Sequence, residues 1–172
     1  MKNIVLIGMM GCGKTTISKL LGKKLNKLVI DTDEYIVNKY HQTIDEMFVI
    51  GEDYFRENET NVCKEIVKLN GYIISTGGGI VLNPVNIKYL KENGIIVFID
   101  RPLNNIKKDV DISSRPLLKE GSDKLDKLYN QRYQLYLDAC DIRLVNDDSL
   151  EISQKRRKDE VHNGNLKKCH PC

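Results

Sequence analysis

A phosphate-binding loop is the feature that most constrains this chain. Residues 8–16 read GMMGCGKTT and match the pattern G-x-x-x-x-G-K-[ST] at every fixed position. The apolar run 4–7 before the loop predicts a buried strand, and the apolar spacing after Lys14 predicts a helix. A loop between a strand and a helix lets glycine N–H groups and the helix N-terminus surround a phosphate group. A chance Gly-rich turn is the alternative, but the order of strand, loop and helix favours a site for a nucleoside triphosphate.

Two residues of the loop carry the expected chemistry. The Lys14 ammonium reaches the terminal phosphates, and the Thr15 hydroxyl ligates magnesium. Cys12 lies near Lys14 and the helix N-terminus, which favours a thiolate, although a small residue tolerated in the loop is the simpler interpretation. The five cysteines are odd in number and widely spaced, so we expect reduced thiols, with Cys63 and Cys140 in the core and no metal at the last two cysteines.

Length and charge restrict the class of protein. At 172 residues the chain is long enough for one domain with a substantial core. The stretch 155–172 contains six basic and two acidic residues, so the rest of the chain has a formal charge of −1. A domain without a strong positive field favours a small charged substrate over nucleic acid. No stretch reaches membrane-spanning length and the N-terminus reads as a first strand, so we expect a cytoplasmic protein without a membrane partner. We also expect a monomer.

Short apolar runs alternate with helical periodicity along the chain. Continuously apolar strands separated by helices predict a parallel sheet with helices on both faces, joined by right-handed crossovers. We therefore expect a three-layer α/β/α domain with a central five-stranded parallel sheet. The predicted strands are 4–7, 28–30, 72–75, 95–99 and 142–145. The predicted helices are one that begins at Lys14, then 33–40, 44–50, 54–69, one from Asn83-Pro84 that Gly94 ends, and 125–139.

Local signals predict the ends and faces of these helices. In the first helix, four residues at apolar spacing form one buried face: Ile17, Leu20, Leu21 and Leu25. Thr43 and Glu46 have the spacing of a capping box before 44–50. Asp53 is the expected cap of 54–69, and Asn83 with Pro84 opens the next helix.

Residues that follow strands are the candidates for a site, because ligands of open parallel sheets bind at the carboxyl ends of the strands. Asp31 and Asp33 follow the second strand, where they could hold magnesium through water and orient or deprotonate an attacking hydroxyl. Asp33 as a helix cap is the alternative. Ser75 ends the third strand, and its hydroxyl could contact the water shell of the metal. Residues 77–79 are glycines whose N–H groups can approach a ligand closely, or else form a flexible turn.

Three arginines complete the candidates. Arg56 and Glu59 share one helical face, where Glu59 could orient the guanidinium fork towards a carboxylate; an exposed helix ion pair is the alternative. Arg115 lies in the long aperiodic segment 110–121, which is either a mobile lid that closes on the transferring phosphate or a surface loop with an incidental arginine. Arg132 could supply a second fork for an anionic substrate.

Taken in order, these motifs resemble those of the shikimate kinase family over about 1–146. The resemblance rests on the phosphate loop, Asp31-Thr32-Asp33, Phe55-Arg56-Glu57-Asn58-Glu59, the glycines 77–79, Arg115-Pro116-Leu117-Leu118, and Arg132 with Tyr136. It implies transfer of the γ-phosphoryl group of ATP to the 3-hydroxyl of shikimate, which gives shikimate 3-phosphate and ADP in the biosynthesis of aromatic amino acids.

The resemblance also implies a role for each candidate residue. The catalytic residues are Lys14, Asp33 as the base, and Arg115. The ATP-binding residues are Gly11, Cys12, Gly13, Lys14, Thr15, Thr16 and Arg115. Shikimate is held by Asp33, Arg56, Gly78, Gly79 and Arg132. Thr15 binds Mg2+ directly, and Asp31 and Ser75 bind it through water.

The chain departs from the family at its C-terminal end. Residues 153–172 lack the apolar stripe of the helix that family members usually have there, so we expect one domain over 1–158 and a basic, poorly ordered tail over 159–172. A helix with a long solvated face, or attachment to nucleic acid, are the alternatives for this stretch. For the whole chain, a gluconate or nucleotide kinase and a nucleotide-binding protein without turnover remain open, because both would share the phosphate loop.

Overall fold

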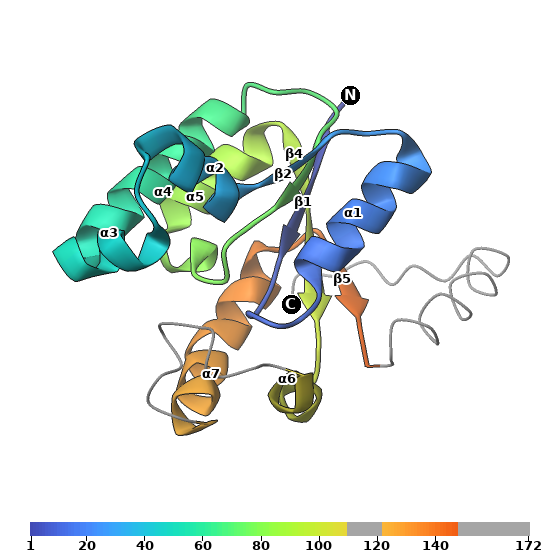
Figure 1. Ribbon diagram of the computed structural model, residues 1–172. Coiled ribbons are helices and arrows are strands. Elements are labelled where there is room, and N and C mark those ends of the chain that lie inside the picture. Colours follow the sequence, from blue (N-terminus) through green and yellow to red (C-terminus); the bar gives the residue numbers. More distant parts are fainter. Residues whose placement is uncertain (110–121, 148–172) are drawn as a thin grey trace, which may run out of the picture.

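A parallel sheet of five strands forms the centre of the computed structural model, which describes residues 1–109 and 122–147 (Figure 1). The strands are β1 (Asn3–Ile7), β2 (Val29–Asp31), β3 (Ile73–Ser75), β4 (Gly94–Asp100) and β5 (Ile142–Val145). Their order across the sheet is β2-β3-β1-β4-β5, and every neighbouring pair is parallel. The strand that leads into the phosphate loop therefore lies in the middle, where Val5, Leu6 and Ile7 are fully buried.

Helices cover both faces of the sheet, which confirms the expected three-layer fold. Figure 1 shows α1 (Lys14–Leu25) on one side of the strands, and α4 (Glu52–Ile66) and α5 (Pro84–Glu92) on the other. On that second side α7 (Ser122–Ala139) packs through Tyr136 on Phe98 of β4. The remaining helices are α2 (Thr32–Tyr40), α3 (Ile44–Ile50), the short 3-10 helix η1 (Ile80–Leu82) and α6 (Leu103–Asp109).

Two of the predicted helix caps are confirmed, one is wrong, and the alternative of Asp33 as a cap is excluded. Thr43 and Glu46 form both hydrogen bonds of a capping box, and the Asn83 side chain accepts from the Val85 N–H. The cap of α2 is Asp31, whose carboxylate accepts the Asp33 N–H at 3.1 Å, so Asp33 is not the cap. Asp53 does not cap α4 either, because α4 begins at Glu52 and the cap position is Gly51.

The buried face of α1 is narrower than the apolar spacing predicted. Ile17 is 1% exposed, but Leu20 is 38% and Leu25 is 45% exposed. The helix approaches β2 closely through Gly22, where an added Cβ would lie 2.5 Å from a methyl carbon of Val29. A contact through a small residue brings the helix backbone against the sheet and leaves the larger flanking leucines outside the contact.

The ends of several elements also differ from the prediction. The predicted helix 54–69 runs from Glu52 to Ile66, and the helix predicted to begin near 125 begins at Ser122. The sequence did not predict the seven-residue α6. The predicted lid, 110–121, and the predicted domain end at 158 with its tail lie outside the described residues. Among the described helices, none is long and apolar enough to cross a membrane.

Candidate active site

Residues that follow the strands converge at one edge of the sheet, as the edge rule predicts. The phosphate loop follows β1, and Asp31 ends β2. Residues 76–79 follow β3, while Arg101 and Asn146 follow β4 and β5. Together they line two adjoining cavities, which share four lining residues: Met10, Asp33, Gly77 and Gly78. This shared wall puts any ligand of one cavity beside a ligand of the other.

The first cavity, of about 380 Å³, lies over the phosphate loop. Its lining includes most of the residues predicted to bind ATP: Gly11, Gly13, Lys14, Thr15 and Thr16. Gly11 and Gly13 have φ of 76° and 98°, backbone angles that glycine adopts without strain. Cys12 is completely buried and does not line the cavity, so it packs in the core, like Cys63 and Cys140.

Lys14 is held inside the loop. Its ammonium donates to the carbonyl oxygens of Gly8 and Met9 at 2.7 and 2.9 Å, and the residue is only 8% exposed. The carbonyl of Cys12 accepts from the Asn146 side chain at 3.0 Å, which ties the loop to the end of β5. The side chains of Lys14 and Asn146, which both line the cavity, therefore hold the loop by hydrogen bonds to its carbonyl oxygens.

Three oxygen-bearing side chains lie together at the ends of β2, β3 and α1. The Thr15 hydroxyl donates to Asp31 at 3.4 Å, and Ser75 stands opposite Asp31 in the sheet register. The Ser75 hydroxyl is buried and has no hydrogen-bond partner within the described part of the chain. Hydroxyl and carboxylate oxygens suit Mg2+, which usually keeps several waters and shares substrate phosphates. Residues 1–109 and 122–147 contain no cluster of three acidic, Cys or His side chains, so such an ion would depend on phosphate and water ligands.

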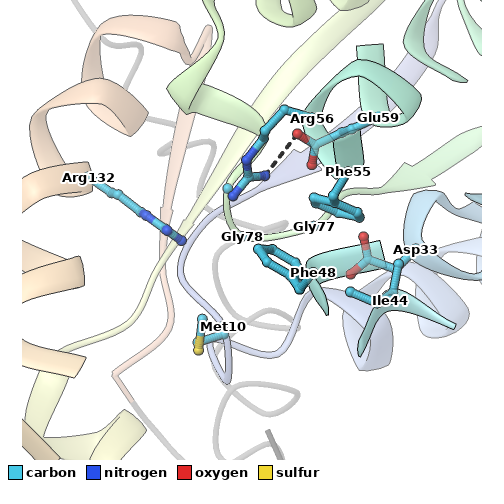
Figure 2. Close-up of a pocket in the computed structure, with 11 residues that line it drawn as sticks. Met10, Asp33, Ile44, Phe48, Phe55, Arg56, Glu59, Gly77, Gly78 and Arg132 are labelled. Atoms are coloured by element: carbon cyan, nitrogen blue, oxygen red, sulfur yellow. Dashed lines mark hydrogen bonds and ion pairs between the residues drawn. The ribbon is translucent and has the colours of Figure 1, made fainter. Parts of the chain in front are cut away.

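The second cavity, of about 150 Å³, combines positive charge with an apolar wall (Figure 2). Arg56 enters from α4 and Arg132 from α7, on opposite sides of the glycine segment. The apolar wall consists of Met10, Ile44, Phe48 and Phe55. The rings of Phe48 and Phe55 stack with their centroids 4.9 Å apart. A small ring that carries a carboxylate matches this combination of surfaces.

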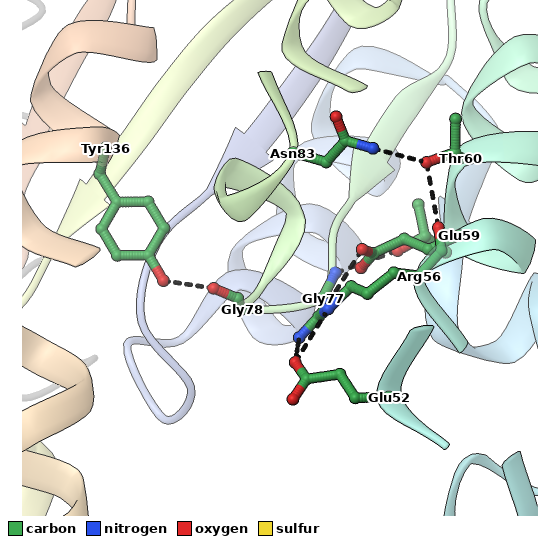
Figure 3. Close-up of polar contacts among 9 residues, drawn as sticks. Glu52, Arg56, Glu59, Thr60, Gly77, Gly78, Asn83 and Tyr136 are labelled. Atoms are coloured by element: carbon green, nitrogen blue, oxygen red, sulfur yellow. Dashed lines mark hydrogen bonds and ion pairs between the residues drawn. The ribbon is translucent and has the colours of Figure 1, made fainter. Parts of the chain in front are cut away.

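Arg56 is held in place by two carboxylates of its own helix (Figure 3). Its guanidinium donates to Glu59 at 2.9 Å and to Glu52 at 3.0 and 3.2 Å. Glu59 is 1% exposed, so the alternative of an exposed helix ion pair is wrong. Burial raises the pKa of Glu59, and the neighbouring Arg56 opposes that rise. The pair therefore fixes the orientation of the fork, as the sequence predicted.

Arg132 is more deeply buried than Arg56 and is 3% exposed. Burial lowers the pKa of its guanidinium, because the charged form is poorly solvated there. Its Nε atom finds no hydrogen-bond acceptor among the residues that the structure describes. A buried guanidinium with an unused donor beside a cavity has the properties of an anion-binding group.

Neighbouring atoms leave little room for a side chain at residues 77–79. A Cβ on Gly77 would lie 2.6 Å from an Asp33 carboxylate oxygen, and one on Gly79 would lie 2.5 Å from two Arg56 nitrogens. A Cβ on Gly78 would lie 3.2 Å from the Met10 nitrogen in the phosphate loop. The segment thus allows the charged side chains and the phosphate loop to meet.

Sequence reasoning missed several residues of the two cavities. Arg101 and Asn146 each follow a strand directly, so the edge rule could have identified them. The apolar wall carried no such signal, since apolar residues on a helix are typical of a core. Glu52 was also missed as a partner of Arg56. The predicted catalytic residue Arg115 lies outside the described residues.

Comparison with known proteins agrees with this geometry. A family model described as shikimate kinase matches residues 10–161. A shikimate kinase of Clostridium botulinum is 47% identical over 95% of this chain and 100% of its own length. A shikimate kinase of Clostridium beijerinckii is 51% identical over 86% of this chain and 88% of its own length.

Solved structures show the same similarity. The shikimate kinase of Acinetobacter baumannii in complex with shikimate superimposes with a TM-score of 0.84 at 30% identity, covering 95% of this chain and 94% of that one. The shikimate kinase of Aquifex aeolicus gives a TM-score of 0.75 at 31% identity, covering 94% of this chain and 97% of that one. With its sequence matched over most of its length, its sheet order and its paired cavities, this chain belongs to the shikimate kinase family.

Proposed function

We propose that this protein transfers the γ-phosphoryl group of ATP to the 3-hydroxyl of shikimate, giving shikimate 3-phosphate and ADP in aromatic amino-acid biosynthesis. The observation that carries the proposal is the wall shared by the two cavities, in which Asp33 and Gly78 line both. A nucleotide over the phosphate loop and an acceptor in the second cavity would meet at that wall. Phosphoryl transfer depends chiefly on such alignment and on charge stabilisation.

Two arginines, Arg56 half-buried and Arg132 buried, recognise the acid in this proposal. Arg56 and Arg132 approach from opposite sides, so both guanidinium groups can hold one carboxylate. Asp33 contacts the ring hydroxyls, and Gly78 and Gly79 supply the backbone beneath the ring. The apolar wall, with Phe48 and Phe55, contacts the faces of the ring that carry no hydroxyl. A charged head and an apolar edge together favour a cyclic acid over an open-chain one.

Asp33 and Lys14 act on the reacting groups. Asp33 is the candidate base, because it lines both cavities and so lies where the acceptor hydroxyl faces the phosphate. Lys14 neutralises charge that develops on the transferring group, and Arg115 has the same role from the predicted lid. An arginine with the role proposed for Arg115 contributes about three to five orders of magnitude in rate in related chemistry.

Thr15 is the residue that would hold Mg2+ directly, with Asp31 and Ser75 acting through its water shell. The ion would supply charge neutralisation between the outer phosphates. Asp31 serves this arrangement and the fold at once, since the same carboxylate caps α2 and accepts from Thr15. The monomeric state and the cytoplasmic location stay predictions.

Acceptor-dependent ADP release tests the proposal. Purified protein with ATP and Mg2+ is expected to release ADP when shikimate is added, and to show little release with gluconate or a nucleoside monophosphate. Omission of Mg2+ is expected to abolish turnover. Turnover with one of the other acceptors and none with shikimate would reject the assignment, and ATP binding without any acceptor-dependent release would favour a protein without kinase activity.

A further inference from the structure

One side chain connects the two halves of the acceptor site. Tyr136 lies one helical turn after Arg132 on α7, and its hydroxyl donates to the carbonyl oxygen of Gly78 (Figure 3). Tyr136 and Gly78 are 58 positions apart in sequence. Through this bond, the helix that carries Arg132 contacts the glycine segment that forms the wall between the cavities.

The ring of Tyr136 is immobilised by its surroundings. The residue is 1% exposed, and its ring stacks on Phe98 of β4 with centroids 5.2 Å apart and an interplanar angle of 21°. Its hydroxyl also lies 4.0 Å from the sulfur of Met9 in the phosphate loop. Burial raises the pKa of Tyr136, so the hydroxyl keeps its proton and donates it to Gly78. The donor therefore has a fixed position relative to the sheet.

A fixed donor on the Gly78 carbonyl also orients the next N–H group. The described part of the chain has no cis peptide bond, and in a trans peptide unit the N–H points opposite to the C=O. When the Gly78 carbonyl points to α7, the Gly79 N–H points away from α7. Gly79 is also the residue on which the Arg56 guanidinium rests, at the far side of the same cavity.

We propose that Tyr136 is a positioning residue for shikimate, an inference that rests on the proposed function. The Tyr136 hydroxyl sets the orientation of the peptide unit between Gly78 and Gly79. It also sets the distance of this peptide unit from Arg132. Arg132 and Gly79 line the acceptor cavity alone, whereas Gly78 lines both cavities. Loss of the hydroxyl is therefore expected to affect binding of the acceptor more than binding of ATP.

Tyr136→Phe tests this role, because it removes the hydroxyl and keeps the stacked ring. We expect KM for shikimate to rise about tenfold, a change equal to the loss of one buried hydrogen bond. KM for ATP is expected to stay close to wild type, and the melting temperature is expected to fall only by a few degrees, because the Gly78 carbonyl loses its donor. Calorimetric titration with shikimate in the absence of ATP is expected to show the same loss of affinity without any turnover.

Tyr133→Phe is the matched control. Tyr133 lies on the same helix, and its hydroxyl donates to Asp100 at 3.1 Å instead of to the glycine segment. We expect this variant to leave KM for shikimate unchanged. If both variants raise KM equally, or if Tyr136→Phe raises KM for ATP as much as for shikimate, the tyrosine serves the fold alone and the proposal is wrong.

Amide exchange in the wild-type protein keeps the proposal testable even if Tyr136→Phe does not fold. Shikimate is expected to slow exchange of the Gly79 N–H, and unchanged exchange at saturating shikimate would overturn the proposal. The failure of the proposed function has a different signature. In that case the wild-type protein itself neither binds nor phosphorylates shikimate.

Discussion

The Arg56 guanidinium rests on Gly79, so closely that a Cβ at this position would lie 2.5 Å from both terminal nitrogens of the arginine. Because Arg56 is also held by Glu52 and Glu59, it has little freedom to move aside. We expect Gly79→Ala to displace the fork and raise KM for shikimate by about tenfold or more. Steady-state kinetics with each substrate varied in turn measures this, and KM for ATP serves as the internal control. An unchanged KM for shikimate would show that the fork moves without cost.

Arg56→Ala is expected to weaken shikimate binding by about 2 to 5 kcal/mol, because the partly buried acid loses one of its two arginine partners. ATP affinity is expected to stay nearly intact, since Arg56 does not line the phosphate cavity. Calorimetric titration with each ligand checks both statements. Equal losses for the two ligands would mean that Arg56 serves the fold.

The same variant leaves Glu59 buried without its partner, which costs stability as well as affinity. Arg56→Ala combined with Glu59→Gln separates the two effects. We expect the double variant to recover much of the free energy of unfolding and none of the shikimate affinity. Recovery of both would assign the whole effect of Arg56→Ala to the buried charge.

Glu59 predicts a pH dependence of stability. Its pKa in the folded protein is raised above the ordinary 4.5, so its charged form is disfavoured by folding. The stabilisation that the Glu59 carboxyl contributes is therefore fully present at pH values below its pKa in the unfolded chain. This stabilisation is lost as the pH rises through its pKa in the folded protein. Compared with the wild type, Glu59→Gln is expected to be relatively more stable at neutral than at acidic pH. Urea unfolding over a pH series measures this, and parallel curves for the two proteins would contradict it.

Lys14→Ala is expected to slow the chemical step by about two to three orders of magnitude, because a charge that acts on the developing phosphate is lost. Single-turnover kinetics measures the step directly, and calorimetry with ATP measures binding apart from it. We expect the affinity for ATP to fall much less than the rate. A loss confined to ATP affinity would assign Lys14 to binding and to the support of its loop through Gly8 and Met9.

Loss of the Asn146 side chain is expected to affect ATP binding, whereas loss of the Tyr136 hydroxyl is expected to affect shikimate binding. Its side chain donates to the Cys12 carbonyl at 3.0 Å, which orients the following N–H of Gly13 in the phosphate loop. We expect Asn146→Ala to raise KM for ATP about three- to tenfold and to leave KM for shikimate unchanged. Asn105→Ala is the control, since Asn105 donates to the Asp147 carbonyl and lines neither cavity. A rise in both KM values for Asn146→Ala would indicate a general loss of structure.

Local patterns were sufficient for much of this fold. All five predicted strands are present, with ends that differ by at most one residue, because a short apolar run such as 4–7 has a length typical of a buried strand. The capping box at Thr43 is likewise local, since both of its hydrogen bonds span three residues. The predicted cap Asp53 and the alternative cap Asp33 were both wrong because an acidic residue suits the first turn of a helix as well as its cap.

By itself the sequence determined the phosphate loop, the parallel sheet and the edge at which the site lies, because strands that alternate with helices form a parallel sheet whose carboxyl ends share one edge. Only the tertiary structure decided which side chains share a cavity. Arg56 and Arg132 come from different helices, and Phe48 is indistinguishable from a core residue until the elements pack. The contact of Tyr136 with Gly78 joins residues 58 positions apart, a distance that no local pattern spans.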